Sequence, residues 1–227
     1  MIKKSIMLSL LSFMSVSLTA QVSEPWSMYK SRTLAGMSRF DGWCTQEKAE
    51  RMMDLILKTS PRLCVEVGVF GGSSFFPTVA ALEYTNSGIA YGVDPWETKA
   101  CLQGNDGANY DWWSHVDLEA ILQRFLKNMR DQNLTHRFRV LRMTSKEAVS
   151  YFVADSIDII CIDGNHADES ALFDAKNWLT KVRSGGYIWF DDADWPTTKK
   201  AVAFLMETCD LDPSSKMGDP YLLFRKR

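Results

Sequence analysis

Residues 62–74, with the sequence RLCVEVGVFGGSS, decide the fold of this chain of 227 residues. The first half of this stretch is a nearly continuous run of apolar, β-favouring residues, which is typical of a strand covered on both faces. The glycine-rich end, 68–74, then breaks the run, and a helix is expected through residues 80–82. A buried strand followed by a glycine turn and a helix favours an α/β fold.

The same alternation continues along the chain. Strands are expected at 62–70, 89–94, 138–143, 157–162, 187–190 and 221–224, with a short partner for the last near 211–217. Besides the helix that runs through 80–82, helices are expected at 47–58, 118–130, 146–152, 170–182 and 197–209. This order predicts a Rossmann-like, doubly wound, mostly parallel sheet with helices on both faces. The carboxyl ends of its strands share one edge, where ligands bind.

The N-terminal segment differs from the rest of the chain. Lys3 and Lys4 precede an apolar stretch with interspersed serines, and Ala20 closes it. This order predicts a signal peptide or membrane anchor at 1–20, followed by an N-terminal extension at 21–39 and one domain at 40–227. A wrongly assigned start or an amphipathic tail is the alternative.

The composition limits the classes of partner that the chain can bind, but it does not decide the cellular compartment. The chain has 26 basic and 28 acidic residues and a net charge of -2, which excludes a nucleic-acid-binding surface built on positive charge. Five scattered cysteines without a C-x-x-C pair predict neither a zinc ribbon nor a disulfide framework. They fit a reducing compartment at least as well as export, so localisation stays undecided between export or membrane tethering and the cytoplasm.

Acidic residues stand at the first two strand ends. Glu66 lies two residues before Gly68, and Phe70 occupies the second glycine position of a dinucleotide fingerprint, so the loop is not that fingerprint. Asp94 ends the second strand, where an acid accepts hydrogen bonds from ribose hydroxyls. Because Pro95 follows it, a plain turn or helix cap is the alternative.

Three more acids follow the fourth and fifth strands. Asp163 ends one strand, and Asp191 and Asp192 end the next, so the three carboxylates are expected to crowd one point. A divalent cation such as Mg²⁺, Ca²⁺ or Mn²⁺ would remove their repulsion, whereas capping of the next helices is the alternative. His166 lies beside them as a ligand, a general base or a structural residue.

Residues 95–117 form an unusually long connection after the second strand. Tyr110, Trp112 and Trp113 lie in it beside several amides and glycines. A loop of this length is usually functional, and its aromatic rings suit a lid over a sugar or aromatic substrate. The alternative is a satellite hydrophobic cluster. His115 of this insertion and His136 are weaker functional candidates.

These residues resemble a known family. Glu66-x-Gly68-x-x-Gly71-Gly72 with Asp94 resembles the S-adenosylmethionine-binding motifs of class I methyltransferases. The stretches 162–166 (IDGNH) and 185–192 (GGYIWFDD) resemble the metal-dependent O-methyltransferase branch of macrocin and mycinamicin type.

The resemblance implies a seven-stranded sheet with a reversed final hairpin, and it implies residue roles. Asp94 would contact the cofactor ribose, and Ser145 would lie near the adenine. Glu66 would contact the cofactor, and Gly68, Gly72 and Ser74 would line its methionine portion. The metal triad would be Asp163, Asp191 and Asp192. Some sugar methyltransferases carry an acidic base at the position of Asn165, and an amide cannot usefully accept a proton.

The function predicted is methyl transfer from S-adenosylmethionine to a hydroxyl of a small molecule or sugar. A divalent metal, Mg²⁺ first, would lower the pKa of the acceptor hydroxyl, and Asp163 and His166 would be catalytic, with His166 as the base. A hydroxylase or hydrolase using the same acids is one alternative. A secreted cofactor-binding module without catalysis is the other.

Overall fold

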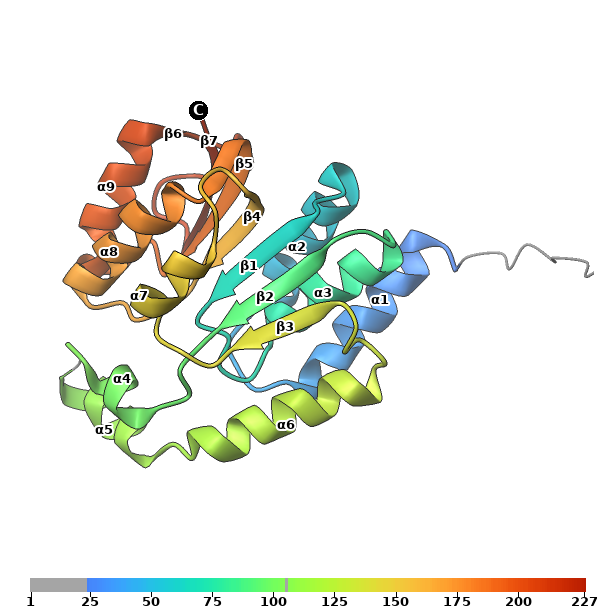
Figure 1. The fold of residues 1–227 in the computed structure, drawn as a ribbon, viewed down its shortest axis with the longest axis horizontal. Helices are drawn as coiled ribbons and strands as arrows, with labels where there is room; N and C mark the ends of the chain where they lie inside the picture. The colour runs from blue at the N-terminus through green and yellow to red at the C-terminus, as the bar shows by residue number, and fades with distance from the viewer. Residues whose placement is uncertain (1–23, 105) are drawn as a thin grey trace, which may run out of the picture.

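The computed structural model describes residues 24–104 and 106–227, so the predicted signal segment 1–20 lies outside the described residues. The chain forms one sheet between two layers of helices (Figure 1). No helix within the described part is both long and apolar enough to cross a membrane.

Seven strands form the sheet in the order β3-β2-β1-β4-β5-β7-β6. Their bounds are β1 Leu63–Val67, β2 Ile89–Val93, β3 Phe138–Leu141, β4 Ile157–Ile162, β5 Val182–Asp191, β6 Cys209–Leu211 and β7 Tyr221–Lys226. Only β7 runs antiparallel to its neighbours, β5 and β6. The predicted fold class and reversed final hairpin are therefore confirmed.

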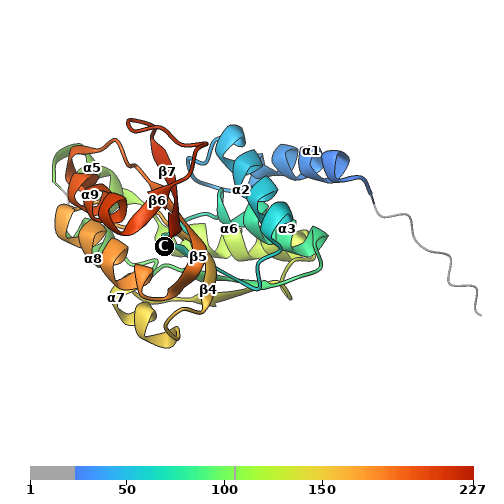
Figure 2. The same cartoon turned by 90° about the horizontal axis from the view of Figure 1, so that it is seen from above.

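Helices cover both faces of the sheet. The α-helices are α1 Trp26–Gly36, α2 Gln46–Thr59, α3 Phe75–Tyr84, α4 Thr98–Leu102, α5 Gly107–His115, α6 Leu118–Asp131, α7 Ser145–Ala148, α8 Asp168–Leu179 and α9 Lys199–Thr208. Short 3-10 turns are η1 Met37–Arg39, η2 Val149–Tyr151 and η3 Pro196–Thr198. One core holds residues of α1, α2, α3 and α6, and the other holds residues of α7, α8 and α9. Figure 2 shows α2 and α3 on one side of the sheet and α8 and α9 on the other.

The fifth strand is longer than the sequence pattern suggests. The helix expected at 170–182 ends at Leu179, and β5 starts at Val182 rather than at 187. Gly185 has a φ of +72°, and the pairing with β4 shifts register between Ile157 and Ile159. The glycines at 185 and 186 thus form an irregular stretch inside the strand, and such a stretch hides the apolar pattern of its first residues.

Two segments for which no helix or strand was predicted contain helices. The insertion 95–117 holds α4 and α5, and the N-terminal extension holds α1. The Tyr29 hydroxyl of α1 donates a hydrogen bond to the backbone oxygen of Ala80 in α3 at 2.8 Å. Leu34 is buried in the core shared with α2 and α3, so α1 packs onto the sheet domain.

Candidate active site

Four neighbouring strands end level with one another at one edge of the sheet. Val67 of β1 is in register with Val93 of β2 and with Ile162 of β4. Ile162 is in turn in register with Phe190 of β5. The next residues on these strands therefore form one row along the edge, in the order Asp94, Gly68, Asp163 and Asp191. The topology thus brings together the acids predicted from the sequence.

Gly68 lets the loops after β1 and β4 touch. Its φ is +86°, and a Cβ atom built on it would lie 1.8 Å from the backbone oxygen of Asp163. Gly72 has a φ of +85°, and a Cβ there would lie 2.5 Å from the Phe125 ring. Any other residue would be strained and would push these segments apart. These two glycines are thus required by close approach within the chain itself.

Glu66 and Ser74 are buried beside this glycine loop. The Ser74 hydroxyl donates a hydrogen bond to Oε1 of Glu66 at 2.7 Å, and Glu66 is only 1% exposed. Its other oxygen, Oε2, is buried without a hydrogen-bond partner among the described residues. Burial raises the pKa of Glu66 to about 7. The carboxyl group therefore keeps an unused acceptor next to the row of strand ends.

Asp94 connects the glycine loop to the start of the insertion. Its Oδ2 accepts a hydrogen bond from the Phe70 backbone N–H at 2.9 Å, and its Oδ1 accepts one from Trp96 at 2.8 Å. Burial raises the pKa of Asp94, and these backbone bonds limit the rise. Asp94 is therefore a turn residue as well as a strand-end acid. Each carboxylate oxygen still has a second lone pair for a ligand hydroxyl.

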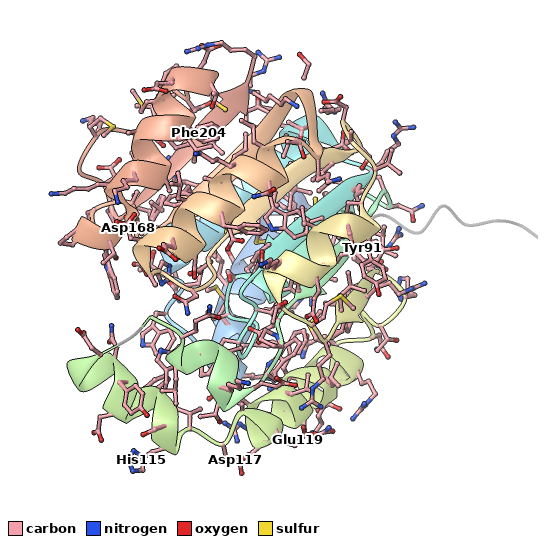
Figure 3. The ribbon with its side chains drawn as sticks, turned by 60° about the vertical axis from the view of Figure 1, so that its left-hand side comes forward. Tyr91, His115, Asp117, Glu119, Asp168 and Phe204 are labelled. Carbon is pink, nitrogen blue, oxygen red and sulfur yellow. The ribbon has the colours of Figure 1, made fainter. Side chains whose placement is uncertain are left out.

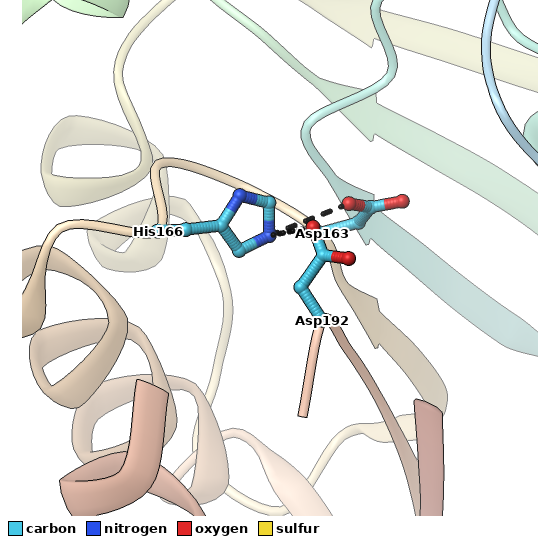
Figure 4. Close-up of side chains that lie close together, drawn as sticks. All are labelled: Asp163, His166 and Asp192. Carbon is cyan, nitrogen blue, oxygen red and sulfur yellow. Dashed lines mark ion pairs between the residues drawn. The ribbon is translucent and has the colours of Figure 1, made fainter. Parts of the chain in front are cut away.

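Asp163, His166 and Asp192 converge on one point (Figure 4). Nε2 of His166 lies 3.1 Å from Oδ2 of Asp192 and 3.7 Å from Oδ1 of Asp163. One candidate ligand atom from each residue lies within 4.8 Å of the other two. Nε2 is buried, and no described residue offers it an aligned hydrogen bond despite the short distance to Asp192. The arrangement is a set of oxygen and nitrogen donors around one point.

A buried lysine reaches the same acids from α2. Nζ of Lys48 forms an ion pair with Asp191 and lies 3.5 Å from Oδ2 of Asp163, and the Lys48 side chain is 4% exposed. Burial opposes its charge, but the attraction of Asp163 and Asp191 holds the pKa of Lys48 well above its ordinary value. Lys48 was not predicted. It precedes Met52 by four residues and so lies on the apolar face of α2, which is the signal that could have revealed it.

The protonation of the cluster follows from burial and from neighbouring charge. Burial and the adjacent Asp191 raise the pKa of Asp163 well above its ordinary value. Burial also opposes the ionisation of Asp191, but Lys48 outweighs it and the pKa of Asp191 is lowered. Burial raises the pKa of Asp192 to about 6 and lowers that of His166 to about 4. Three carboxyl groups thus face one ammonium and a neutral imidazole, so a further cation would relieve their repulsion.

Ser145, which follows β3, is part of a buried network. Its hydroxyl donates a hydrogen bond to Oδ1 of Asp174 and accepts one from Nε1 of Trp178 at 2.7 Å. Burial raises the pKa of Asp174 to about 7. Because the hydroxyl donates its proton to Asp174 and accepts one bond from Trp178, it has one lone pair left.

An aromatic cluster lies over the glycine loop. Trp43 stacks on Phe70 with ring centroids 5.3 Å apart, and both rings contact Trp112 of the insertion. Trp113 packs edge-on against Phe70 and Trp112. Trp43 is 69% exposed, and Tyr110 and Trp112 are also exposed. Trp112 and Trp113 of the insertion thus join a cluster with Trp43 and Phe70, which were not predicted, and the role of the insertion as a lid stays a prediction.

The other two histidines lie away from the acid cluster. Figure 3 shows His115 at the outer end of α5, apart from Asp168 at the start of α8. The His115 side chain is 77% exposed and its Nδ1 lies 2.7 Å from the backbone oxygen of Asp111. His136 pairs with Glu83 at 2.8 Å on the surface. Neither histidine joins the candidate site.

A family model described as a methyltransferase domain matches residues 65–193, which is more than half of the chain. This chain belongs to the methyltransferase-domain family. The match includes the row of strand ends, His166 and Asp192 but not Trp43 or Lys48. The segment that carries these two residues therefore adds to what the family model describes.

A curated relative and several solved structures are similar to this methyltransferase-domain chain. Protein y4gI of Sinorhizobium fredii, which is uncharacterised, is 28% identical over 145 residues, which are 63% of this chain but 14% of the relative. The O-methyltransferase NovP shares 17% identity with a TM-score of 0.66, over 88% of this chain and 98% of NovP. TomG of Streptomyces achromogenes, an O-methyltransferase solved with S-adenosylmethionine, shares 15% identity with a TM-score of 0.58, over 92% and 93%. At these identities, the structural matches show a shared fold.

Proposed function

We propose that this chain transfers a methyl group from S-adenosylmethionine to a hydroxyl oxygen of a small molecule or sugar, assisted by a divalent metal. The observation that carries the proposal is the convergence of Asp163, His166 and Asp192 at the carboxyl edge of a methyltransferase domain. The O-methyltransferases NovP and TomG, which share the fold, support the choice of oxygen as the acceptor atom.

The ends of β1, β2 and β3 are the proposed cofactor site. The ligand brings an ammonium group and ribose hydroxyls, all of which are donors, and this edge offers buried carboxylate acceptors with unused lone pairs. We assign Asp94 to the ribose and Ser145 to the adenine side. Glu66, Gly68, Gly72 and Ser74 are assigned to the methionine portion, with Glu66 and Ser74 acting from within the buried loop.

The acid cluster fits a hard divalent cation such as Mg²⁺, because it offers carboxylate oxygens and an excess of negative charge. Asp163 and Asp192 would hold the ion. Asp191, the third acid implied by the resemblance, is engaged by Lys48 in this structure, so we assign it to holding Lys48. When bound, such an ion lowers the pKa of the acceptor hydroxyl.

His166 is the proposed base. Its imidazole is neutral at neutral pH, and Nε2 faces the acids without an aligned hydrogen bond. As the acceptor oxygen forms its bond to the methyl carbon, the bond from that carbon to sulfur breaks, and S-adenosylhomocysteine leaves. The hydroxyl proton passes to Nε2. Because the sulfonium needs no activation, the remaining task of the protein is to align oxygen, carbon and sulfur.

The aromatic cluster supplies the proposed acceptor surface. Trp43 and Trp112 expose ring faces beside Phe70, whose backbone N–H bonds to Asp94. Such faces stack on sugars and on aromatic rings alike. Closure of this surface over the acceptor would also exclude water from the reacting atoms.

One experiment tests the function directly. The full-length protein is incubated with S-adenosylmethionine, Mg²⁺ and a panel of phenols and sugars, and the products are weighed by mass spectrometry. We expect a product heavier by one methylene group, together with S-adenosylhomocysteine, and loss of both in His166→Ala but not in the surface variant Asp210→Asn. A gain of one oxygen atom would indicate a hydroxylase instead. Tight calorimetric binding of the cofactor without any methylated product would indicate a non-catalytic module.

A further inference from the structure

The side chain of Asn165 joins two segments beside His166. Its Nδ2 donates hydrogen bonds to the backbone oxygens of Gln103 at 2.7 Å and Ala100 at 3.4 Å, at the end of α4. Its Oδ1 accepts a hydrogen bond from the Ala167 backbone N–H at 2.8 Å. One amide thus holds the insertion with one end and the loop around His166 with the other.

These contacts need an amide and no other group of its shape. The two carbonyl oxygens require a donor, whereas the Ala167 N–H requires an acceptor, so the amide fits in one orientation only. An aspartate could keep the bond from Ala167, but its second oxygen would face the carbonyl oxygens of α4 and repel them. Substitution by aspartate therefore keeps the hydrogen bond from Ala167 and removes the hydrogen bonds to α4.

A second contact joins the same two segments. Gly104 has a φ of +74°, and a Cβ atom built on it would lie 2.6 Å from Cβ of Ala167. The backbone of the insertion thus approaches the His166 loop more closely than a side chain permits. This close approach does not depend on the amide of Asn165, so the docking has two separate structural supports.

We infer that Asn165 is a positioning residue, which docks the first part of the insertion, residues 97–104, onto the loop that carries His166. Because Asn165 and Ala167 flank His166, the docked insertion and the imidazole are set relative to each other. Helix α5, which carries Trp112, packs against α4, so docking also sets the distance between this part of the acceptor surface and the base. The contribution of docking to methyl transfer rests on the proposed function, whereas the docking itself does not.

Hydrogen exchange of the full-length protein tests the docking without any assay of activity. The amides of Ala100, Cys101 and Gln103, which are bonded within α4, report its opening. In Asn165→Asp we expect them to exchange about tenfold faster, since about one hydrogen bond is lost or opposed. In Gly104→Ala we expect a similar increase, because the new Cβ is strained at this φ and meets Cβ of Ala167. The amide of Ala171, which donates to the Ala167 backbone oxygen at the start of α8, should stay protected in Asn165→Asp. The control Asn177→Asp loses a side-chain donor to a carbonyl within α8 and should not affect α4.

Kinetics test the positioning. In Asn165→Asp and Gly104→Ala we expect the KM of the acceptor to rise and kcat to fall, together by about tenfold in kcat/KM, with the affinity for S-adenosylhomocysteine nearly unchanged. Unchanged exchange in both variants, or faster exchange with unchanged kinetics, would overturn the inference. Faster turnover in Asn165→Asp would overturn it too, because position 165 would then serve as a base. Faster exchange in a chain that never methylates any acceptor would support the docking and overturn the proposed function.

Discussion

At the scale of single residues, Lys48 is the buried cation of the acid cluster. Its ammonium is buried between Asp163 and Asp191, and no other lysine or arginine lies within ion-pair distance of either acid among the described residues. The His166 imidazole beside Asp163 is neutral at neutral pH. A buried ion pair is weak support for stability, but loss of one partner leaves a buried charge without compensation. The lysine thus determines whether Asp191 can remain ionised inside the fold.

Replacement of Lys48 by methionine should therefore destabilise the fold strongly. In the presence of a chelator we expect the free energy of unfolding, measured in urea, to fall by about 3 kcal/mol. Lys48→Met with Asp191→Asn should recover part of the loss, because one uncompensated carboxylate is removed. Lys58→Met, at an exposed position of the same helix, is the control. Equal stability of Lys48→Met and Lys58→Met would show that the acids are protonated without the lysine.

Asp174 should make stability depend on pH. Burial raises its folded pKa to about 7, above the ordinary value of 3.8, so the native state keeps a proton that the unfolded state loses between these values. The contribution is fully present below pH 3.8 and is lost as pH rises through about 7. Asp174→Asn removes it, so the variant should gain on the order of 2 kcal/mol relative to wild type between pH 5 and pH 8. Urea unfolding of both proteins at pH 5 and pH 8 measures this difference. An equal change in the free energy of unfolding of the two proteins between these pH values would refute the prediction.

At the scale of elements, the pattern of apolar residues predicted the core strands and failed where other contacts set the structure. The strands β1, β2, β3 and β4 are short and continuous, so their apolar runs were sufficient. The start of β5 was missed because Gly185 and Gly186 interrupt its pattern. Helix α1 was missed because its buried residues are few and it is held by α3, which only tertiary structure reveals.

The segment between α1 and α2 is the element we expect to govern acceptor binding. It places Trp43 on Phe70 and leads into α2, whose first turn carries Lys48. Because Trp43 is 69% exposed, Trp43→Ala should change the free energy of unfolding by less than about 1 kcal/mol. The KM of an aromatic acceptor should rise about tenfold, as expected for loss of a stacked ring. Tyr151→Ala, which removes an exposed ring on η2, is the control, and an equal KM in both variants would place the acceptor elsewhere.

At the scale of the whole molecule, the site is assembled from both helical layers around one sheet edge. The strand-end acids could be predicted because parallel topology puts the residues after β1, β2, β4 and β5 in one row. The ion pairs that these acids form could not be predicted. Lys48 arrives from α2 across the edge and takes Asp191, which leaves His166 beside Asp163 and Asp192. Such a choice of partners depends on distances of a few ångströms that strand order does not specify.

We assigned Asp163 and Asp192 to the divalent ion and Asp191 to Lys48, and this assignment predicts how the ion stabilises the whole protein. An ion that binds only the folded state raises the melting temperature, by about 5 °C or more for a chain of this size at 100 times its dissociation constant. We expect Mg²⁺ or Mn²⁺ to have this effect on wild type and on Asp210→Asn, and to lose it in Asp163→Asn and Asp192→Asn. His166→Ala should keep the shift and lose turnover, because the imidazole takes the proton and does not hold the ion. If His166→Ala also loses the shift, Nε2 is a ligand and the base must be another group; if Asp163→Asn keeps it, the ion binds outside this cluster.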